Sequence, residues 1–337
     1  MTKKQNFGTT AARSAKKKIE RSGSKSGRFF KHISSWIIYL LAIYGAHSLC
    51  AQYNAYYRNW VEKYTGNIYR SVKSVENDLA PQPAIIIRNN SDLAQTRYDN
   101  LTMGVPAFCD TVIDRCGYAL GYSEQHEQPL WVSYKLTREE VRSKKAKRSG
   151  DFRADKAIAT KSADPADYKG SFFDRGHLAP AADMSFSLQA MSESFYMSNM
   201  SPQRPEFNRG IWKTLEEKVR FFAENHGDLY VVSGPIFDYT KPVVTIGKNK
   251  VAVPDKYYKV LLDANAANPK AVGFMLPHKD TSRDISAFVV PVDVVEKASG
   301  LDFFNALDDD IEEKLESSCD YSAWQKRQPD LRIKSRR

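Results

Sequence analysis

The chain has 337 residues, of which 42% are hydrophobic and 12% are aromatic, so it can bury one large core or two smaller ones and is not an intrinsically disordered protein. Its formal net charge is +10, but residues 1–32 carry +9 and residues 326–337 carry +5, which leaves −4 for the middle. The basic character therefore belongs to the two ends, and nucleic-acid binding by the middle must be argued from local sites.

An apolar stretch follows the basic tail of residues 1–32. Both faces of Ile33–Leu49 are apolar, and its 17 residues are close to the minimum length of a membrane span. The sequence predicts a transmembrane anchor over residues 33–50, with the basic tail in the cytoplasm and the remainder outside, in a periplasmic or extracellular space. A cleaved signal that releases a secreted protein, a mitochondrial import sequence and a buried helix remain alternatives.

The rest of the chain divides by composition. Residues 51–104 resemble a stalk or linker, residues 105–320 have the texture of a mixed domain, and residues 321–337 form a second basic tail. Short β-branched and aromatic runs predict strands at Leu130–Leu136, Asp228–Ser233, Val243–Ile246, Tyr257–Asp263, Ala271–Leu276 and Ala287–Pro291. Amphipathic patterns predict helices at Leu188–Tyr196, Ile211–Asn225, Val292–Ala298 and Asp308–Ser317, with Gly227 and Gly300 as stops. Strands and helices that interleave without strict alternation indicate an α+β fold.

Two of the four cysteines, Cys109 and Cys116, flank a six-residue segment that the sequence suggests is a short loop or hairpin. In an oxidising compartment this pair would close a small disulfide, and otherwise both would be buried thiols. The sequence leaves both interpretations open.

One short segment concentrates groups suited to acid–base chemistry. Asp174-Arg175-Gly176-His177 follows a pair of phenylalanines that resembles a strand end. In an extended backbone Arg175 and His177 point to one face and Asp174 to the other, where it is available to bond backbone donors of the turn. A guanidinium beside an imidazole disfavours the protonated ring, so His177 is a candidate general base.

A second polar cluster lies downstream in a proline-containing loop that opens a helix. It contains Asn199 and Asn208, and Glu216 lies eight residues beyond Asn208, about 12 Å along a helix axis. That separation is too long for both side chains to ligate one ion directly, but it suits a magnesium ion that keeps its waters, with Glu216 holding one of them. Taken singly, Asn208 is more simply a helix cap and Glu216 an exposed carboxylate.

Together these motifs resemble those of a known family, the DNA/RNA non-specific endonucleases with the ββα-metal (His-Me finger) fold. The motifs are Asp174-Arg-Gly-His177, Asn199-x-x-Pro-Gln203, Asn208-x-Gly-x-Trp212 and Leu215-Glu216. The resemblance covers about residues 105–317. It implies an α+β fold with a central antiparallel sheet flanked by helices, here preceded by the predicted membrane segment.

The resemblance also implies a role for each matching residue. His177 matches the general base that activates water, and Asn208 matches the single protein ligand of a magnesium ion, with manganese as an alternative. Glu216 matches the residue that holds metal-bound waters, Asn199 the amide that supports the base, and Arg175 the motif arginine near the phosphate.

The family has a further arginine upstream, which stabilises the transition state. Arg148 and Arg153 both fit its pattern of an arginine, an aromatic residue and an aspartate, and Arg148 fits better. Arg148 ends the basic run of residues 142–148, which is either a patch that follows phosphates or a solvated loop.

The sequence therefore predicts a metal-dependent endonuclease that cuts DNA and RNA with little sequence preference and leaves 5′-phosphate ends. Its expected partners are DNA, RNA, a membrane and, by resemblance, a second copy in a homodimer. Two alternatives remain: an anchored nucleic-acid binding or uptake protein without catalysis, and a hydrolase of another phosphoester. The first alternative has no need of a general base, which counts against it.

Overall fold

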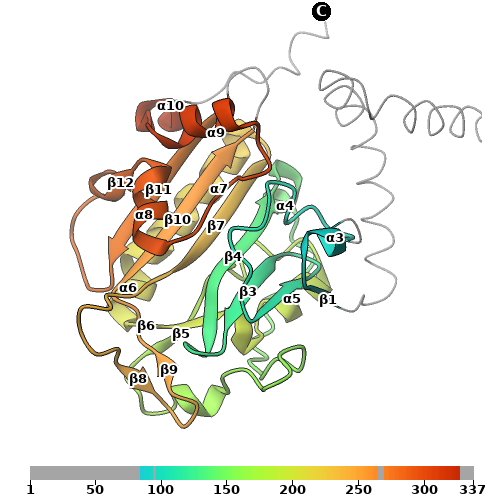
Figure 1. Cartoon of the computed structure of the whole chain (residues 1–337), viewed down its shortest axis with the longest axis vertical. Coiled ribbons are helices and arrows are strands. Elements are labelled where there is room, and N and C mark those ends of the chain that lie inside the picture. Colours follow the sequence, from blue (N-terminus) through green and yellow to red (C-terminus); the bar gives the residue numbers. More distant parts are fainter. Residues whose placement is uncertain (1–83, 94–95, 265–268, 327–337) are drawn as a thin grey trace, which may run out of the picture. The chain divides into compact units, whose positions relative to one another are not determined.

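The computed structural model describes residues 84–93, 96–264 and 269–326 (Figure 1). The basic tail of residues 1–32, the predicted anchor of residues 33–50 and most of the C-terminal tail lie outside the described residues. Within the described ranges, no helix is both long enough and apolar enough to cross a membrane.

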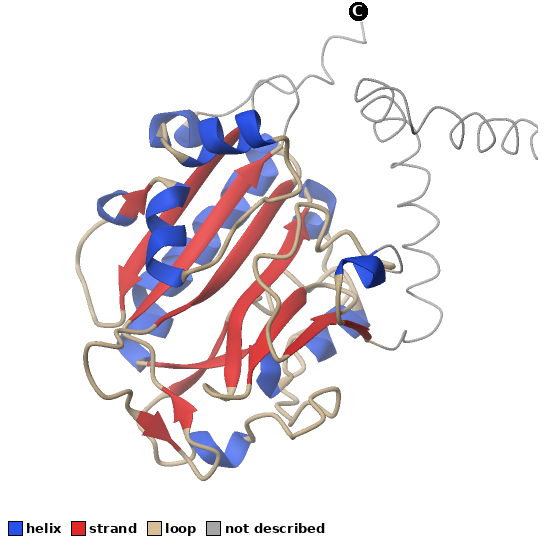
Figure 2. Cartoon of the chain, in the orientation of Figure 1, coloured by secondary structure: helices blue, strands red, loops and turns tan. Residues whose placement is uncertain are grey.

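An eight-stranded sheet organises the described part of the chain (Figure 2). Its strands lie in the order β1, β2, β3, β4, β7, β10, β11, β12, and every neighbouring pair is antiparallel. Their bounds are Ile85–Ile87, Thr111–Asp114, Ala119–Ser123, Gln128–Leu136, Leu229–Ile236, Lys256–Asp263, Lys270–Pro277 and Val289–Val290. The predicted central antiparallel sheet is therefore confirmed.

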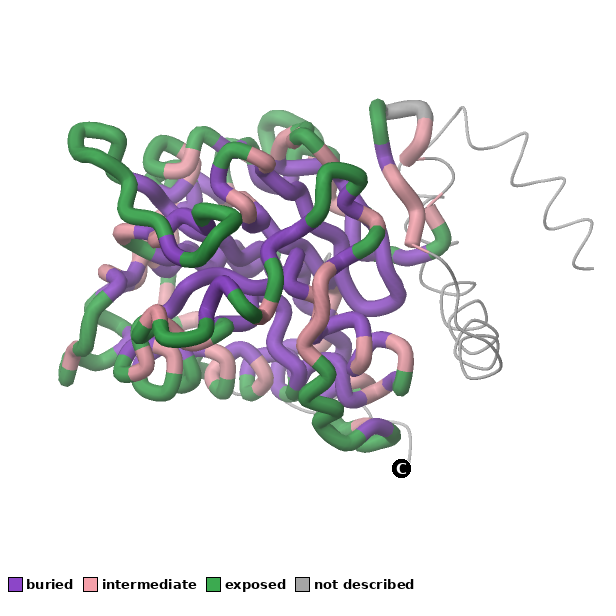
Figure 3. The backbone as a smooth tube through the Cα atoms, turned by 90° about the horizontal axis from the view of Figure 1, so that it is seen from below, coloured by how far each residue is buried: buried purple, intermediate pink, exposed green. Residues whose placement is uncertain are grey.

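The central strands are buried on both faces, so they are nearly continuous apolar runs. Along β10, Tyr257 and Leu261 pack into the core on one face of the sheet, whereas Tyr258, Val260 and Leu262 pack into the core on the other. This alternation follows from the two-residue period of a strand. Figure 3 shows the result: buried segments run through the middle of the molecule, and most exposed segments lie at its periphery.

Helices cover both faces of the sheet. On one face, α7 (Lys213–His226) buries Leu215, Val219 and Phe222, which recur at helical spacing. On the other face, α8 (Val292–Ser299) buries Val292 and Val295. The other α-helices of the described residues are α3 (Asn90–Leu93), α4 (Arg138–Arg142), α5 (Leu188–Glu193), α6 (Pro205–Phe207), α9 (Asp309–Glu316) and α10 (Tyr321–Gln325).

The predicted helix stops are confirmed. Gly227 follows α7 with φ of 109°, and Gly300 follows α8 with φ of 72°. These left-handed conformations are accessible to glycine at little energetic cost, which explains why both helices end there.

The structure revises three expectations at the margins of the domain. Strand β1 pairs with β2, so part of the segment 51–104 belongs to the sheet and is not a linker. Trp324 of α10 is fully buried, so residues 321–325 belong to the core and not to a tail. Cys109 and Cys116 are free thiols at opposite ends of β2, which is a strand and not the expected loop.

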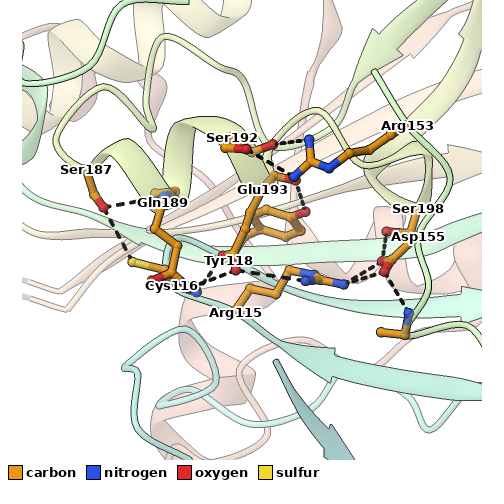
Figure 4. Close-up of polar contacts among 12 residues, drawn as sticks. Arg115, Cys116, Tyr118, Arg153, Asp155, Ser187, Gln189, Ser192, Glu193 and Ser198 are labelled. Carbon is orange, nitrogen blue, oxygen red and sulfur yellow. Dashed lines mark hydrogen bonds and ion pairs between the residues drawn. The ribbon is translucent and has the colours of Figure 1, made fainter. Parts of the chain in front are cut away.

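A buried ion pair joins the sheet to the segments that carry the polar motifs (Figure 4). The Nη2 atom of Arg115, just beyond β2, donates to both carboxylate oxygens of Asp155 at 2.7 and 2.6 Å. Asp155 also accepts a hydrogen bond from the hydroxyl of Ser198 at 2.5 Å. The backbone amide of Cys116 donates to Glu193 of α5 at 3.1 Å. These bonds fix α5 and residues 155 and 198 to one end of the sheet.

We expect Arg115→Met to lower the free energy of unfolding by about 3–5 kcal/mol, because it leaves the Asp155 carboxylate buried without its cation. Urea unfolding of the full chain, followed by far-UV circular dichroism, measures the change. Arg142→Met is the control, since Arg142 is exposed and its loss should change stability by no more than about 0.5 kcal/mol. Equal losses in the two variants would contradict this account of the ion pair.

Candidate active site

A two-stranded ribbon presents the histidine motif. Strand β5 (Asp174–His177) pairs with β6 (Met200–Gln203), and His177 lies opposite Met200. A Cβ atom at Gly176 would overlap the side chain of Gln203, so glycine is required by close packing and not by backbone freedom. The expected aromatic strand end is wrong at Phe172, which precedes β5 with φ of 66° and a side chain 91% exposed.

The ring of His177 lies in an aromatic pocket. Its edge packs against Phe152 and Phe195, with ring centroids 5.7 and 4.9 Å away, and the residue is only 8% exposed. The Nε2 atom is buried and has no hydrogen-bond partner, which leaves Nδ1 as the ring nitrogen open to solvent. Burial, followed by the charges of Arg148 and Arg175, lowers the pKa of His177 to about 3. The imidazole is therefore neutral at physiological pH.

The three candidate arginines differ in whether their guanidinium groups are hydrogen-bonded to other residues. Arg148 is exposed, lies 4.9 Å from the Phe195 ring and acts electrostatically on both His177 and Glu216. Arg175 is exposed and lies 4.0 Å from the ring of Phe152.

Arg153, in contrast, is tied to the scaffold. It donates to the carboxylate of Asp151 at 2.7 Å and to the backbone and hydroxyl oxygens of Ser192, and its guanidinium lies 3.9 Å from the Tyr196 ring. Figure 4 shows its contacts with Ser192 on α5. Arg148 therefore has the free guanidinium that a phosphate ligand needs, whereas the donors of Arg153 are committed to the fold.

Asn199 is fully buried and supports the backbone that follows His177. Its Oδ1 accepts from the amide of Ala179 at 2.9 Å, and its Nδ2 donates to the carbonyls of Ala179 and Ser194 at 3.0 and 2.9 Å. All of the hydrogen bonds recorded for this side chain are to backbone groups. Its geometry is that of a positioning residue, since the three bonds hold the chain just beyond the imidazole.

Asn208 is placed differently from the cap that the sequence suggested. It begins the segment Asn208–Trp212, which joins α6 to α7 across a kink at Gly210, where φ is −100° and ψ is −111°, and α7 starts two residues later than predicted. Its Nδ2 donates to Asp174 at 2.9 Å, and Asp174 also accepts two hydrogen bonds from Arg209 at 2.9 and 2.7 Å. Because Nδ2 is hydrogen-bonded to Asp174, Oδ1 is the atom of this side chain that can ligate a cation.

The sequence interpretation missed the role of Asp174. This carboxylate binds side chains, not the backbone donors of a turn, and it orients the amide of Asn208. The sequence signal for this role was the position of Asp174 in the motif. Along β5 its side chain faces away from that of His177, on the side of the helix that follows β6.

Glu216 is half-buried on α7 and lies among charged groups. Burial and the charge of Asp183 raise the pKa of its carboxyl to about 8, although the positive charges of Lys259, Arg220 and Arg148 oppose that shift. Lys259 is fully buried on β10, bonds the hydroxyl of Ser233 and lies 4.7 Å from the ring of Trp212. The sequence signal for this group was a lysine in the middle of an otherwise apolar run of β10.

The residues fit a hard, hydrated dication. One neutral amide oxygen on Asn208 and one carboxylate on Glu216 are the donor types that magnesium accepts, and so short a ligand set suits an ion that retains most of its waters. The structure brings His177, Arg148, Arg175 and Glu216 into electrostatic contact. The side chain of Asn208 is hydrogen-bonded to Asp174 on β5, and Asn199 lies behind the site.

Comparison with known proteins identifies the family. Residues 98–310 match the model described as DNA/RNA non-specific endonuclease, so the chain belongs to the DNA/RNA non-specific endonuclease family. Among relatives, it is 39% identical over 202 residues to Endonuclease G, mitochondrial, of Homo sapiens, covering 56% of this chain and 68% of that protein. It is 34% identical over 243 residues to a nuclease of Syncephalastrum racemosum, covering 66% and 76%.

A solved structure agrees with this assignment. The fold is similar to that in a crystal structure of an EndoG/EndoGI complex, with a TM-score of 0.58 and 32% sequence identity, covering 66% of this chain and 95% of that chain.

We expect NMR titration of the metal-free protein to give His177 a pKa well below 6.5, because burial and two cations disfavour the charged ring. Arg148→Gln should raise this pKa, since it removes one of the cations. The ring signals are assigned by comparison with His177→Gln. A pKa at or above 6.5, or one that Arg148→Gln leaves unchanged, would contradict the proposed electrostatics. The shift also predicts that the contribution of His177 to folding stability is present above pH 6.5 and is lost as the pH falls toward 3.

Proposed function

We propose that this chain is an endonuclease that hydrolyses DNA and RNA phosphodiesters with little sequence preference, with His177 as general base and Asn208 as the protein ligand of a magnesium ion. One observation carries the proposal: a neutral, buried imidazole lies beside two exposed arginines. This arrangement combines a proton acceptor with donors for a phosphate. Membership of the endonuclease family supports it.

Magnesium, with manganese as an alternative, would be held by Oδ1 of Asn208 and, through water, by the carboxylate of Glu216. When bound, the ion supplies positive charge that offsets the negative charge on the phosphate and the leaving oxygen. Asp174 prepares this site, because it accepts a hydrogen bond from Nδ2 and so leaves the amide oxygen of Asn208 for the ion.

The chain's own groups perform the remaining tasks. Nδ1 of His177 accepts a proton from a water molecule whose oxygen attacks the phosphorus atom, and the bond from phosphorus to the 3′ oxygen breaks. Arg148 and Arg175 bind the non-bridging oxygens and stabilise their charge. The expected products carry 5′-phosphate and 3′-hydroxyl ends. Contacts with phosphate carry no base information, which is consistent with cutting of both polymers.

The deciding experiment incubates the full chain with supercoiled plasmid and with structured RNA, with and without Mg²⁺, beside His177→Ala. We expect Mg²⁺-dependent cutting of both polymers, which His177→Ala reduces by about 10²–10⁴-fold because the proton acceptor is lost. His226→Ala is the control, since it removes a buried imidazole that bonds Trp324 outside the site. Binding of both polymers without cutting under any divalent ion would favour the uptake-protein alternative. Cleavage of small phosphoesters alone would favour the other one.

A second comparison separates the two upstream arginines. Arg148→Ala should lower kcat by about 10²-fold with little change in unfolding, because its guanidinium is free to stabilise the transition state. Arg153→Ala should instead lower the melting temperature with a smaller change in kcat, since its donors hold Asp151 and Ser192. Gel assays of initial rates and thermal unfolding provide the measurements. Equal, small losses of kcat would remove both residues from the mechanism.

The location and assembly of the protein remain predictions. The anchor that would place the nuclease domain outside the cytoplasm lies in residues 33–50, beyond the described residues. Relatives named Endonuclease G and Nuclease EXOG are described as mitochondrial, which favours the mitochondrial alternative for the basic, apolar N-terminus. The homodimer rests on family resemblance.

A further inference from the structure

A cluster of carboxylates lies where α8 meets α9, on the face of the sheet opposite α7. Asp293 and Glu296 are three residues apart on α8, and Glu312 and Glu316 are four residues apart on α9, so each pair occupies one face of its helix. One carboxylate oxygen each from Asp293, Glu296 and Glu316 lies within 4.8 Å of the other two. Three negatively charged groups therefore converge on one point.

The Glu316 side chain is the unusual member of this cluster. It is only 4% exposed, and its Oε1 atom is buried with no hydrogen-bond partner. Oε1 of neighbouring Glu312 is also buried and without a partner. An unpaired buried carboxylate is strongly destabilising, so this site requires either a proton or a cation.

The charges that act most strongly on Glu316 are all negative. Burial and the charges of Glu296, Glu312, Asp293 and Asp302 raise the pKa of Glu316 to about 9. Within the described part of the chain, none of these five residues forms an ion pair. The described residues therefore leave the charge of this cluster without a compensating cation.

We propose that Asp293, Glu296 and Glu316 bind one divalent cation, and that calcium suits them best. Calcium binds carboxylate oxygens at about 2.3–2.6 Å, so two ligand oxygens on opposite sides of it are about 5 Å apart. Magnesium is usually held by one or two carboxylates and keeps several waters, whereas calcium takes a larger set of oxygen ligands. Three carboxylates whose oxygens lie within 4.8 Å of one another are therefore a set that suits calcium.

The local structure also provides a route by which the ion can enter and one carboxylate that is already held in position. Asp293 is exposed, so an ion can enter from solvent and exchange its waters for the two more buried carboxylates. Oε1 of Glu296 accepts a hydrogen bond from the backbone amide of Phe303 at 2.7 Å, which fixes the Glu296 side chain in place. The bound ion ties α8 to α9 across the face of the sheet that does not carry the nuclease site.

Calorimetric titration of the EDTA-treated full chain with Ca²⁺ tests the proposal. The full chain should bind Ca²⁺ at a site that Glu316→Gln weakens at least about tenfold and that Asn208→Ala, which alters the nuclease site, retains. Asp293→Asn is a second variant for the case in which Glu316→Gln folds poorly, because Asp293 is exposed. Glu313→Gln is the matched control, since Glu313 is exposed on α9 and outside the cluster.

Thermal unfolding provides an independent readout. Millimolar Ca²⁺ should raise the melting temperature of the wild type and of Glu313→Gln, but not that of Glu316→Gln or Asp293→Asn. The proposal is wrong if Ca²⁺ binds neither form, or if Glu316→Gln and Asp293→Asn bind it like the wild type. A second outcome would also contradict it: Glu316→Gln is more stable than the wild type in EDTA, and Ca²⁺ stabilises neither protein. The carboxyl of Glu316 would then be protonated in the wild type and would not bind a cation.

Discussion

Burial of the His177 ring is the constraint on which the rest of the site depends. The ring stays neutral because Phe152 and Phe195 exclude water and because Arg148 and Arg175 are near. An imidazole in open solution would be partly protonated near neutral pH and less available as a base. In the proposed mechanism the same two arginines bind the phosphate, so one arrangement of charge would both keep the base deprotonated and attract the substrate.

That constraint explains features that seem unrelated in the sequence. Strand β5 must be held rigidly, and the contact of Gly176 with Gln203 brings β5 and β6 close together. Beyond His177, the amide of Asn199 bonds the backbone on both sides of Ala179. Behind the ribbon, Arg115 and Asp155 connect it to the sheet through Ser198. Each contact limits movement of the imidazole, which general-base catalysis requires.

The sequence predicted the strands and helices better than the connections between them. Strands such as β10 and helices such as α7 were predictable because their apolar periodicity is strong and local. The hydrogen bond between Asn208 and Asp174 was not predictable, because the two residues are 34 positions apart and meet only in the folded chain. The pairing of β1 and the burial of Trp324 were missed for the same reason, since both depend on distant partners.

Distant partners also give different surroundings to two glutamates on opposite faces of the sheet, Glu216 and Glu316. Glu216 lies near Lys259, Arg220 and Arg148, whose positive charges partly oppose the rise in its pKa to about 8 that burial and the charge of Asp183 cause. The charges that act most strongly on Glu316 are those of other carboxylates, and nothing in its helix distinguishes it from Glu313 at the level of sequence. Only the folded chain brings its oxygen within 4.8 Å of two others. A cation there would bind the folded state and not the unfolded chain, so its binding energy would add to stability.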